Sequence, residues 1–145
     1  MIHVQHYNCG GNAGLDGKNY NSGTADFQVA MAEMLLQGFN LGNNQNAFFE
    51  PLRPDQVGIG IPAKPQAAPA GGYISPSEMK KALDYLIFGK SYGGQYTLQN
   101  PDGYKQFRGV MTWSINWDGT QNNSFAKEYR QYFDSIGGER LQPIK

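Results

Sequence analysis

The sequence predicts an α/β fold in which parallel strands alternate with helices. Three stretches that have the character of strands, at residues 2–7, 57–62 and from Phe107 onward, are each followed by a segment with helical periodicity. A strand that returns to the same sheet after a helix makes a crossover connection, and crossovers join parallel strands. The order strand, helix, strand, helix, strand, helix therefore indicates one parallel sheet with helices packed on it.

Three strands do not make a complete α/β sheet. They cannot close into a barrel, and an open three-stranded sheet leaves unpaired backbone groups along two edges. The strand at residues 2–7 also begins almost at the first residue, without a capping segment. We therefore expect the single domain of residues 1–145 to be part of a larger structure.

The stretch of residues 107–118 is the most informative of the three strands. Alternation puts Val110 and Thr112 on one face and Met111 and Trp113 on the other, so both faces can be buried. The carboxyl end of such a strand is where α/β proteins place their chemistry. Two polar side chains follow in this region, Asn116 and Asp118.

The other two strands show the same two-faced pattern. His3, Gln5 and Tyr7 share one face of the first strand, opposite a face that carries Ile2, Val4 and His6. In residues 57–62 the apolar side chains alternate with Gly58 and Gly60. One face of that strand thus has no side chains of its own, and this predicts free space beside it.

Helix boundaries are marked by local signals. Thr24 is a suitable N-cap for a helix at residues 25–37, which Gly38 ends. A second helix, at residues 75–88, begins with Ser, Pro and a Glu three residues after the cap, the pattern of a capping box. A third helix is expected at residues 124–136. We expect loops at residues 8–23, 39–56, 63–74 and 92–105, the last with a short hairpin, and a polar loop after the strand that begins at Phe107.

Composition excludes several classes of function. Twelve basic and twelve acidic side chains cancel, so the chain is not expected to bind nucleic acid or an anionic membrane surface. No apolar run approaches the length of a membrane span, and no signal peptide is visible. The single cysteine rules out an internal disulfide. A low charge together with many Gly, Asn, Gln and Tyr residues suits polar loops that present aromatics to carbohydrate.

Three short motifs do not indicate function. His3, His6 and Cys9 have a spacing seen in metal sites, but a separation of three along a strand puts the two histidines on opposite faces. Residues 89–91, Gly-Lys-Ser, follow a helix rather than a strand and so do not form a phosphate loop. Asn122 begins a glycosylation sequon, which is common by chance. The sequence predicts neither a metal nor a cofactor.

Three segments together resemble family 18 glycoside hydrolases, the chitinases, and in particular secreted bacterial ones. Residues 3–8 (His-Val-Gln-His-Tyr-Asn) are similar to their sixth barrel strand, and residues 56–63 (Gln-Val-Gly-Ile-Gly-Ile-Pro-Ala) to their seventh. Residues 108–118 (Arg-Gly-Val-Met-Thr-Trp-Ser-Ile-Asn-Trp-Asp) are similar to their eighth. The resemblance implies the C-terminal part of a (β/α)8 TIM barrel, strands six to eight with their helices. It also implies an extracellular location.

The resemblance implies a role for four residues. In this family the substrate's own 2-acetamido oxygen attacks the anomeric carbon while a Glu protonates the leaving oxygen. Tyr7 matches the catalytic tyrosine whose hydroxyl holds the acetamido group. Gln5, Asn8 and Trp113 match substrate-binding positions: a polar neighbour, a residue near the reacting sugar, and the aromatic floor of a subsite. The expected ligands are chitin or chitooligosaccharides, and the expected partner is the missing N-terminal barrel half.

The sequence lacks the acidic motif that supplies the general acid in this family. The fourth-strand motif Asp-x-x-Asp-x-Asp-x-Glu occurs nowhere in the chain, and its twelve acidic residues are scattered. We therefore expect the isolated chain to be inactive. Two alternatives stay open: a non-catalytic, lectin-like chitin-binding protein, and a half-barrel scaffold that dimerises through its open edges.

Each candidate residue also has a plainer interpretation. Gln5 can simply satisfy polar neighbours, and Trp117 favours packing or loop anchoring over a sugar subsite. Tyr73 and Tyr92, in loops, could line outer subsites.

Overall fold

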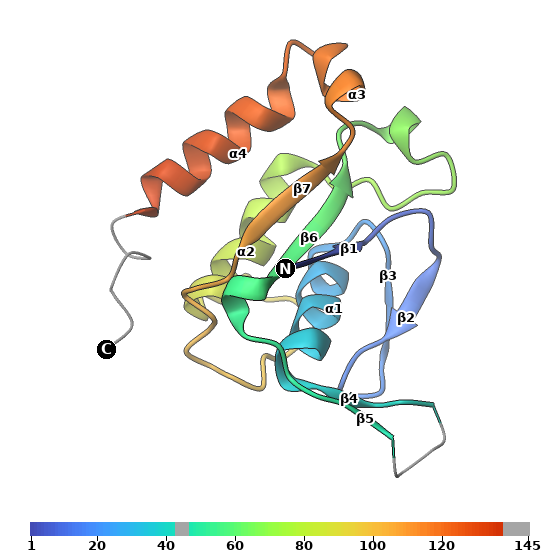
Figure 1. Cartoon of the computed structure of the whole chain (residues 1–145), viewed down its shortest axis with the longest axis vertical. Coiled ribbons are helices and arrows are strands. Elements are labelled where there is room, and N and C mark those ends of the chain that lie inside the picture. The colour runs from blue at the N-terminus through green and yellow to red at the C-terminus, as the bar shows by residue number, and fades with distance from the viewer. Residues whose placement is uncertain (43–46, 138–145) are drawn as a thin grey trace.

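A three-stranded parallel sheet forms the centre of the computed structural model, which describes residues 1–42 and 47–137 (Figure 1). Strand β6 (Val57–Pro62) lies between β1 (Ile2–Gln5) and β7 (Gly109–Trp113). Gln5 pairs with Gly60, and Pro62 pairs with Trp113. Parallel strands joined by helices confirm the predicted α/β class.

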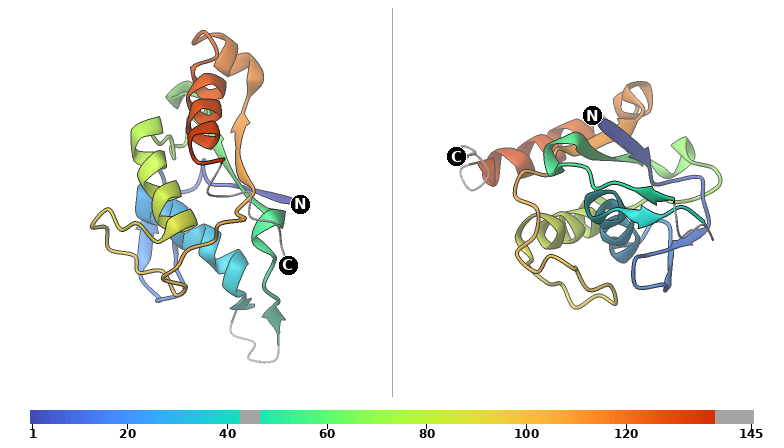
Figure 2. Two further views of the ribbon diagram at one scale, coloured as in Figure 1. Left: turned by 90° about the vertical axis from the view of Figure 1, so that its left-hand side faces the viewer. Right: turned by 60° about the horizontal axis from the view of Figure 1, so that its bottom comes forward.

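All three long helices lie on the same side of this sheet, as Figure 2 (left) shows. They are α1 (Ala25–Gln37), α2 (Pro76–Phe88) and α4 (Ser124–Ser135). The apolar side chains of β6 point into this helical layer and are almost fully buried, namely Val57, Ile59 and Ile61. No α-helix of the described residues lies on the opposite face of the sheet.

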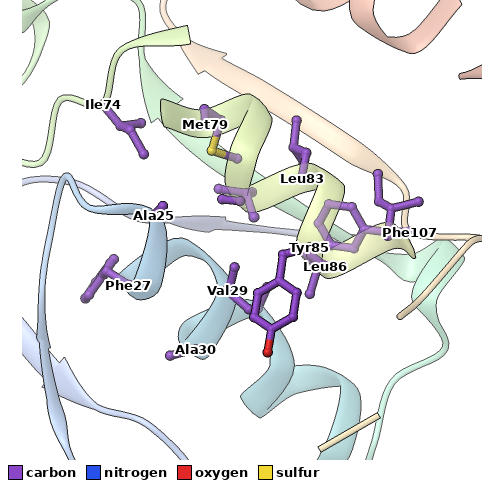
Figure 3. Packing of buried hydrophobic residues seen from close by; sticks show 14 of the residues in the cluster. Ala25, Phe27, Val29, Ala30, Ile74, Met79, Leu83, Tyr85, Leu86 and Phe107 are labelled. Atoms are coloured by element: carbon purple, nitrogen blue, oxygen red, sulfur yellow. The ribbon is translucent and has the colours of Figure 1, made fainter. Parts of the chain in front are cut away.

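The core fills the space between α1, α2 and the sheet (Figure 3). Met79, Leu83 and Leu86, spaced three and four residues apart on α2, are buried there. Phe107, just before β7, is also fully buried and packs into the same cluster. Burying such side chains stabilises the fold by about 1.5–3 kcal/mol each, so this layer supplies most of the driving force for folding.

The predicted helix starts are confirmed at α1 and α2. The Thr24 hydroxyl accepts a hydrogen bond from the Phe27 N–H at 3.2 Å, and Ser75 accepts one from Glu78 at 3.3 Å. The capping box at α2 is confirmed on the serine side only, because the Glu78 carboxylate pairs with Lys81 instead.

The segment after β7 differs from the prediction. A short helix, α3 (Ile115–Gly119), replaces the expected polar loop. Asp118 is only 2% exposed, and its carboxylate accepts hydrogen bonds from the N–H groups of Phe125 at 2.8 Å and Ala126 at 3.1 Å. It therefore caps α4, whose own N-cap residue, Asn123, makes no side-chain cap. Asp118 supports this helix and does not belong to a site at the strand end.

Two of the expected loops contain hairpins. Residues 8–23 include β2 (Gly11–Ala13) and β3 (Asn19–Asn21), which pair antiparallel. Residues 39–56 include β4 (Phe39–Asn40), β5 (Phe48–Phe49) and the 3-10 turn η1 (Pro54–Gln56). A second 3-10 turn, η2 (Pro65–Ala67), follows β6. The prediction of structureless loops here was wrong, since short antiparallel pairs leave little periodicity in a sequence.

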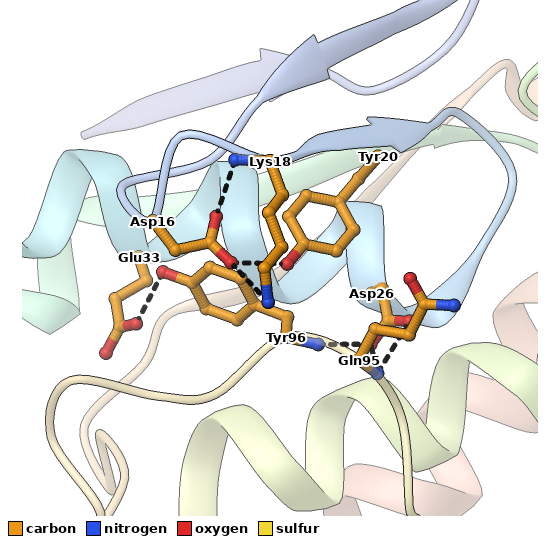
Figure 4. Close-up of polar contacts among 7 residues, drawn as sticks. All are labelled: Asp16, Lys18, Tyr20, Asp26, Glu33, Gln95 and Tyr96. Atoms are coloured by element: carbon orange, nitrogen blue, oxygen red, sulfur yellow. Dashed lines mark hydrogen bonds and ion pairs between the residues drawn. The ribbon is translucent and has the colours of Figure 1, made fainter.

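The segment of residues 92–105 contains no strand in the structure, so the predicted short hairpin there was wrong. Two carboxylates of α1 hold it instead (Figure 4). Glu33, fully buried, accepts hydrogen bonds from the hydroxyls of Tyr96 at 2.8 Å and Tyr104 at 2.6 Å. Asp26 accepts from the backbone N–H of Tyr96 at 3.1 Å. Burial and the neighbouring Glu33 carboxylate raise the pKa of the Tyr96 phenol, which keeps it a hydrogen-bond donor.

No helix within the described ranges is long and apolar enough to cross a lipid bilayer.

Candidate functional site at the uncovered sheet face

The helix-free face of the sheet presents a small set of exposed side chains. Gln5 of β1 pairs with Gly60, so Gln5 lies on the same face as that glycine, and Met111 pairs with Gly60 from the other side. Trp113, two residues beyond Met111, lies on this face as well. Polar and aromatic side chains therefore lie on the face of the sheet that the helices leave open.

The glycines of β6 make this face close-packed. A Cβ atom on Gly58 would lie 2.5 Å from the His3 Cδ2 atom, and one on Gly60 would lie 2.9 Å from the Met111 Cε atom. The side-chain-free face predicted for this strand is therefore present. The space beside it is filled by its neighbours, so the prediction of free space was wrong.

Tyr7 lies two residues beyond the end of β1. The pairing stops there because Pro62 of β6 has no N–H to continue the ladder, and the last bond is from the His6 N–H to the Gly60 oxygen at 2.9 Å. His6 points toward α1, so the alternation turns Tyr7 toward the uncovered face. Tyr7 is 5% exposed, and burial raises the pKa of its phenol. Within the described part of the chain its hydroxyl has no hydrogen-bond partner.

Gln5 and Asn8 both contact the backbone around Tyr7. The Gln5 amide donates to the Tyr7 carbonyl oxygen at 3.0 Å. Asn8, in the left-handed conformation with φ 54°, donates its N–H to the Gly71 oxygen at 2.9 Å and accepts from the Ala70 N–H at 3.1 Å through Oδ1. Both side chains remain exposed, so each keeps a polar atom free toward solvent.

Trp113 ends β7 and is 53% exposed, a large fraction for an indole. Its backbone oxygen accepts from the Ala63 N–H at 3.0 Å, which ties the carboxyl ends of β6 and β7 together. Trp117 is half-buried, with the Lys64 ammonium 5.2 Å from its ring centroid. This contact covers part of Trp117, as expected for a residue that anchors a loop.

The two principal candidates, Tyr7 and Trp113, lie at the same end of the sheet with β6 between them. A hollow lined by Gln5, His6 and side chains of α1 lies beside β1, and another lies between the end of β6 and α4. The structure therefore brings Tyr7 and Trp113 to the same end of the sheet, on either side of β6.

His6 lies on the helical side and is 1% exposed. Its Nδ1 atom is 2.8 Å from the Gln28 Oε1 atom, and desolvation by burial lowers its pKa to about 4. His3 is exposed on the opposite face, which agrees with the prediction that the two histidines point apart. Residues 1–42 and 47–137 contain no group of three or more potential metal ligands.

The sequence did not reveal the contact between Tyr7 and the segment at residues 70–72. A Cβ atom on Gly72 would lie 2.6 Å from the Tyr7 Cα atom. The adjacent glycines Gly71 and Gly72 were a signal for a close backbone approach, but nothing in the sequence shows what approaches them.

Comparison with known proteins shows extensive similarity to chitinases. The chain is 55% identical over 144 residues to Chitinase D of Niallia circulans and 54% identical over 144 residues to Chitinase Chi52 of Paenibacillus xylanexedens. It is 41% identical over 133 residues to Exochitinase 1 of Streptomyces olivaceoviridis. The chain is homologous to part of the bacterial chitinases. These alignments cover 99%, 99% and 92% of this chain but only 27%, 27% and 21% of the relatives.

Solved structures agree with this homology. A family 18 chitinase from Chromobacterium violaceum superposes with a TM-score of 0.81 at 36% identity, over 89% of this chain and 34% of that chain. A structure described as chitinase A from Streptomyces coelicolor gives a TM-score of 0.76 at 36% identity, over 93% and 41%. A scan against protein-family models gives no match. The expected family resemblance is thus confirmed, and the chain spans about a quarter of the length of the first two relatives.

Proposed function

We propose that this chain is the part of a family 18 chitinase that carries strands six to eight of a (β/α)8 barrel, with β1, β6 and β7 in those places. The complete protein would cleave β-1,4 linkages between N-acetylglucosamine units of chitin or chitooligosaccharides. The observation that carries this proposal is the placement of Tyr7 and Trp113 together at the carboxyl end of the sheet. In barrel enzymes the active site lies at that end.

Tyr7 is proposed to hold the substrate's acetamido group. As the acetamido oxygen attacks the anomeric carbon, the glycosidic bond breaks and an oxazolinium ring forms, which water later opens with retention. A phenol that stays protonated can donate a hydrogen bond to this group as its charge changes. Burial, which raises the Tyr7 pKa, and a hydroxyl without a partner within the described part of the chain both suit that role.

Trp113 is proposed to form the floor of the sugar subsite. An indole stacks on the apolar face of a pyranose and releases water from both surfaces. Its 53% exposure leaves the ring available for such a contact. Gln5 and Asn8, exposed beside Tyr7, are proposed to bind polar groups of the same sugar.

General acid catalysis is proposed to come from outside this chain. Protonation of the leaving oxygen needs a carboxylic acid within hydrogen-bond reach, and the family's acidic motif is absent from the sequence. The chain by itself is therefore proposed to be inactive. An extracellular location stays a prediction.

The open edge of β1 is the proposed contact with the rest of the barrel. Among the described residues, only β6 pairs with β1 in the sheet, and the hollow beside it, of about 220 Å³, is lined in part by apolar side chains of α1. Met31, Met34 and Leu35, apolar residues spaced three and four apart on that helix, are only partly buried. The missing N-terminal half of the barrel is the proposed occupant.

A chimera tests the proposed function. Residues 1–145 replace the matching segment of Niallia circulans Chitinase D, whose remaining sequence supplies the rest of the barrel. We expect the chimera to hydrolyse a chitooligosaccharide and the isolated chain to show no hydrolysis. Tyr7→Phe should lower kcat about 100-fold, the size of effect seen when one transition-state hydrogen-bond donor is removed.

The matched control is Tyr129→Phe, which removes from α4, on the helical side of the sheet, a buried hydroxyl that has no hydrogen-bond partner among the described residues. Hydrolysis by the isolated chain would refute its proposed dependence on an external acid. A well-folded chimera in which Tyr7→Phe and Tyr129→Phe behave alike would refute the role of Tyr7.

Sugar binding without catalysis is a second candidate function, because the exposed Trp113 ring needs no acid to bind a pyranose. In that case the isolated chain would bind chitooligosaccharides, and Trp113→Ala would abolish the binding. Isothermal titration calorimetry with the two proteins distinguishes this function from the first.

A further inference from the structure

The segment of residues 69–72 lies against the backbone of Tyr7. A Cβ atom on Gly72 would come within 2.6 Å of the Tyr7 Cα atom and 2.9 Å of its Cβ atom. Real Cβ atoms do not approach other atoms so closely, so only glycine fits here. This segment belongs to the connection between β6 and α2 and is distant from Tyr7 in sequence.

Asn8 makes two hydrogen bonds to the same segment next to this contact. Its N–H donates to the Gly71 oxygen at 2.9 Å, and its Oδ1 atom accepts from the Ala70 N–H at 3.1 Å. The Asn8 backbone has φ 54°, a conformation that asparagine tolerates better than most residues. One residue thus supplies both hydrogen bonds that hold residues 70–71 beside Tyr7.

Gln5 completes the arrangement from the other side. Its amide donates to the Tyr7 carbonyl oxygen at 3.0 Å. The ladder between β1 and β6 has already stopped at this point, because Pro62 offers no N–H. Tyr7 therefore depends on side-chain and loop contacts to keep its place at the end of the strand.

We propose that Asn8 and Gly72 are positioning residues that hold Tyr7 in place through the segment between β6 and α2. This inference rests on the proposed function for its consequence in catalysis, but the positioning itself can be measured without any substrate. Asn8 thereby acts through the tyrosine, in addition to any contact with sugar.

Two neighbouring glycines provide a matched pair of variants. Gly71 has φ 98° and Gly72 has φ 94°, so alanine brings similar backbone strain at either position. A Cβ atom on Gly71 would meet nothing within 4 Å, whereas one on Gly72 would meet Tyr7. Any difference between Gly71→Ala and Gly72→Ala therefore reports the contact with Tyr7.

The first experiment uses the 145-residue chain with ¹³C-labelled tyrosine and follows the Tyr7 ring signal by NMR, assigned with Tyr7→Phe. We expect Gly72→Ala to shift this signal and to lower the phenol pKa toward 10, because the displaced ring becomes more hydrated. Gly71→Ala should leave both unchanged. The same response in both variants, or in neither, would overturn the proposal.

Asn8 is tested by removing its acceptor while keeping its backbone freedom. Asn8→Gly retains φ above zero but loses Oδ1, and we expect it to shift the Tyr7 signal. Asn8→Asp keeps an acceptor oxygen for the Ala70 N–H and should restore the original signal. Failure of aspartate to restore it would show that the hydrogen bond to Ala70 does not position Tyr7.

The second experiment places these variants in the active chimera. Gly72→Ala should lower kcat at least tenfold relative to Gly71→Ala while changing KM less than threefold. In a Tyr7→Phe background the difference between the two alanine variants should disappear, because the hydroxyl being positioned is gone. A difference that persists would mean that Gly72 acts on something other than Tyr7.

The two proposals fail in distinguishable ways. An inactive chimera with an intact NMR response would contradict the proposed function and leave the positioning of Tyr7 supported. An active chimera in which Tyr7→Phe lowers kcat but the glycine variants behave alike would retain the function and refute the positioning.

Discussion

The two faces of the central sheet differ in how far other elements cover them. The face toward α1, α2 and α4 carries Val57, Ile59 and Ile61, each about 1% exposed. The other face carries Gln5 and the 53%-exposed Trp113. The first is a finished hydrophobic core, and the second is a surface with candidate chemistry. Stability and proposed function are therefore separated across a single layer of strands.

The largest expected effect comes from the covered face. Ile59→Ala removes a fully buried side chain from the middle of β6, and we expect it to lower the free energy of unfolding by about 4 kcal/mol. Gln5→Ala, on the uncovered face, should change it by less than about 0.5 kcal/mol. Urea denaturation followed by circular dichroism measures both. Equal losses of unfolding free energy in the two variants would show that the two faces do not differ in their contribution to stability.

Acid should destabilise the chain through one histidine and not the other. The folded-state pKa of His6, about 4, lies below the ordinary value of 6.5, so between these values the unfolded chain binds the extra proton. The free energy of unfolding should therefore fall by about 3 kcal/mol from pH 7 to pH 4 through His6. His6→Gln should remove this part of the pH dependence.

His3→Gln is the control for that measurement, because His3 lies on the same strand but is exposed on the other face. Urea denaturation at pH 7, 5.5 and 4 gives the comparison. If His3→Gln flattened the profile as much as His6→Gln does, burial of His6 would not be the source of the acid sensitivity.

A smaller effect on stability is expected at Asp118, whose carboxylate caps α4 in the helical layer. Asp118→Ala removes the acceptor of the Phe125 and Ala126 N–H groups and should cost about 2 kcal/mol of stability. Asp118→Asn keeps one acceptor oxygen and should cost about half as much. Thermal unfolding distinguishes the two. A neutral Asp118→Ala would mean that α4 does not depend on this cap.

The smallest effect on stability is expected at Trp113, whose indole is largely exposed. Trp113→Ala should change the free energy of unfolding by less than about 0.5 kcal/mol, because water already reaches the ring. In the chimera it should nevertheless weaken chitooligosaccharide binding about tenfold, measured as Kd by fluorescence. A loss of stability as large as that of Ile59→Ala would show that the ring is part of the core.

Prediction from sequence succeeded where the cause is local. Thr24 and Ser75 cap their helices with their own hydroxyls, and the alternation of β6 correctly separates Ile59 from Gly60. It failed where the partner lies in another element. Asp118 appeared to be a strand-end residue, yet its partners are N–H groups in the first turn of α4. The short hairpins were missed for a different reason, since their strands of two or three residues carry no detectable period.

For the candidate site too, some features follow from short stretches of sequence and others only from the folded structure. Tyr7 and Trp113 were named from the resemblance of short sequence segments to family 18 chitinases, and alternation along each strand added only the face on which they lie. Their common edge depends on the register of three strands, which pairs Gln5 with Gly60 and Pro62 with Trp113.

Local chemistry thus specifies the strands, the helix starts and the residues that face away from the core, because these depend on neighbours along the chain. The packing of Gly72 against Tyr7 and the burial of Glu33 under the tyrosines of residues 92–105 depend on contacts between distant segments. Such contacts form only when the chain has folded, because their geometry follows from the register of the sheet and from the placement of α1 on it.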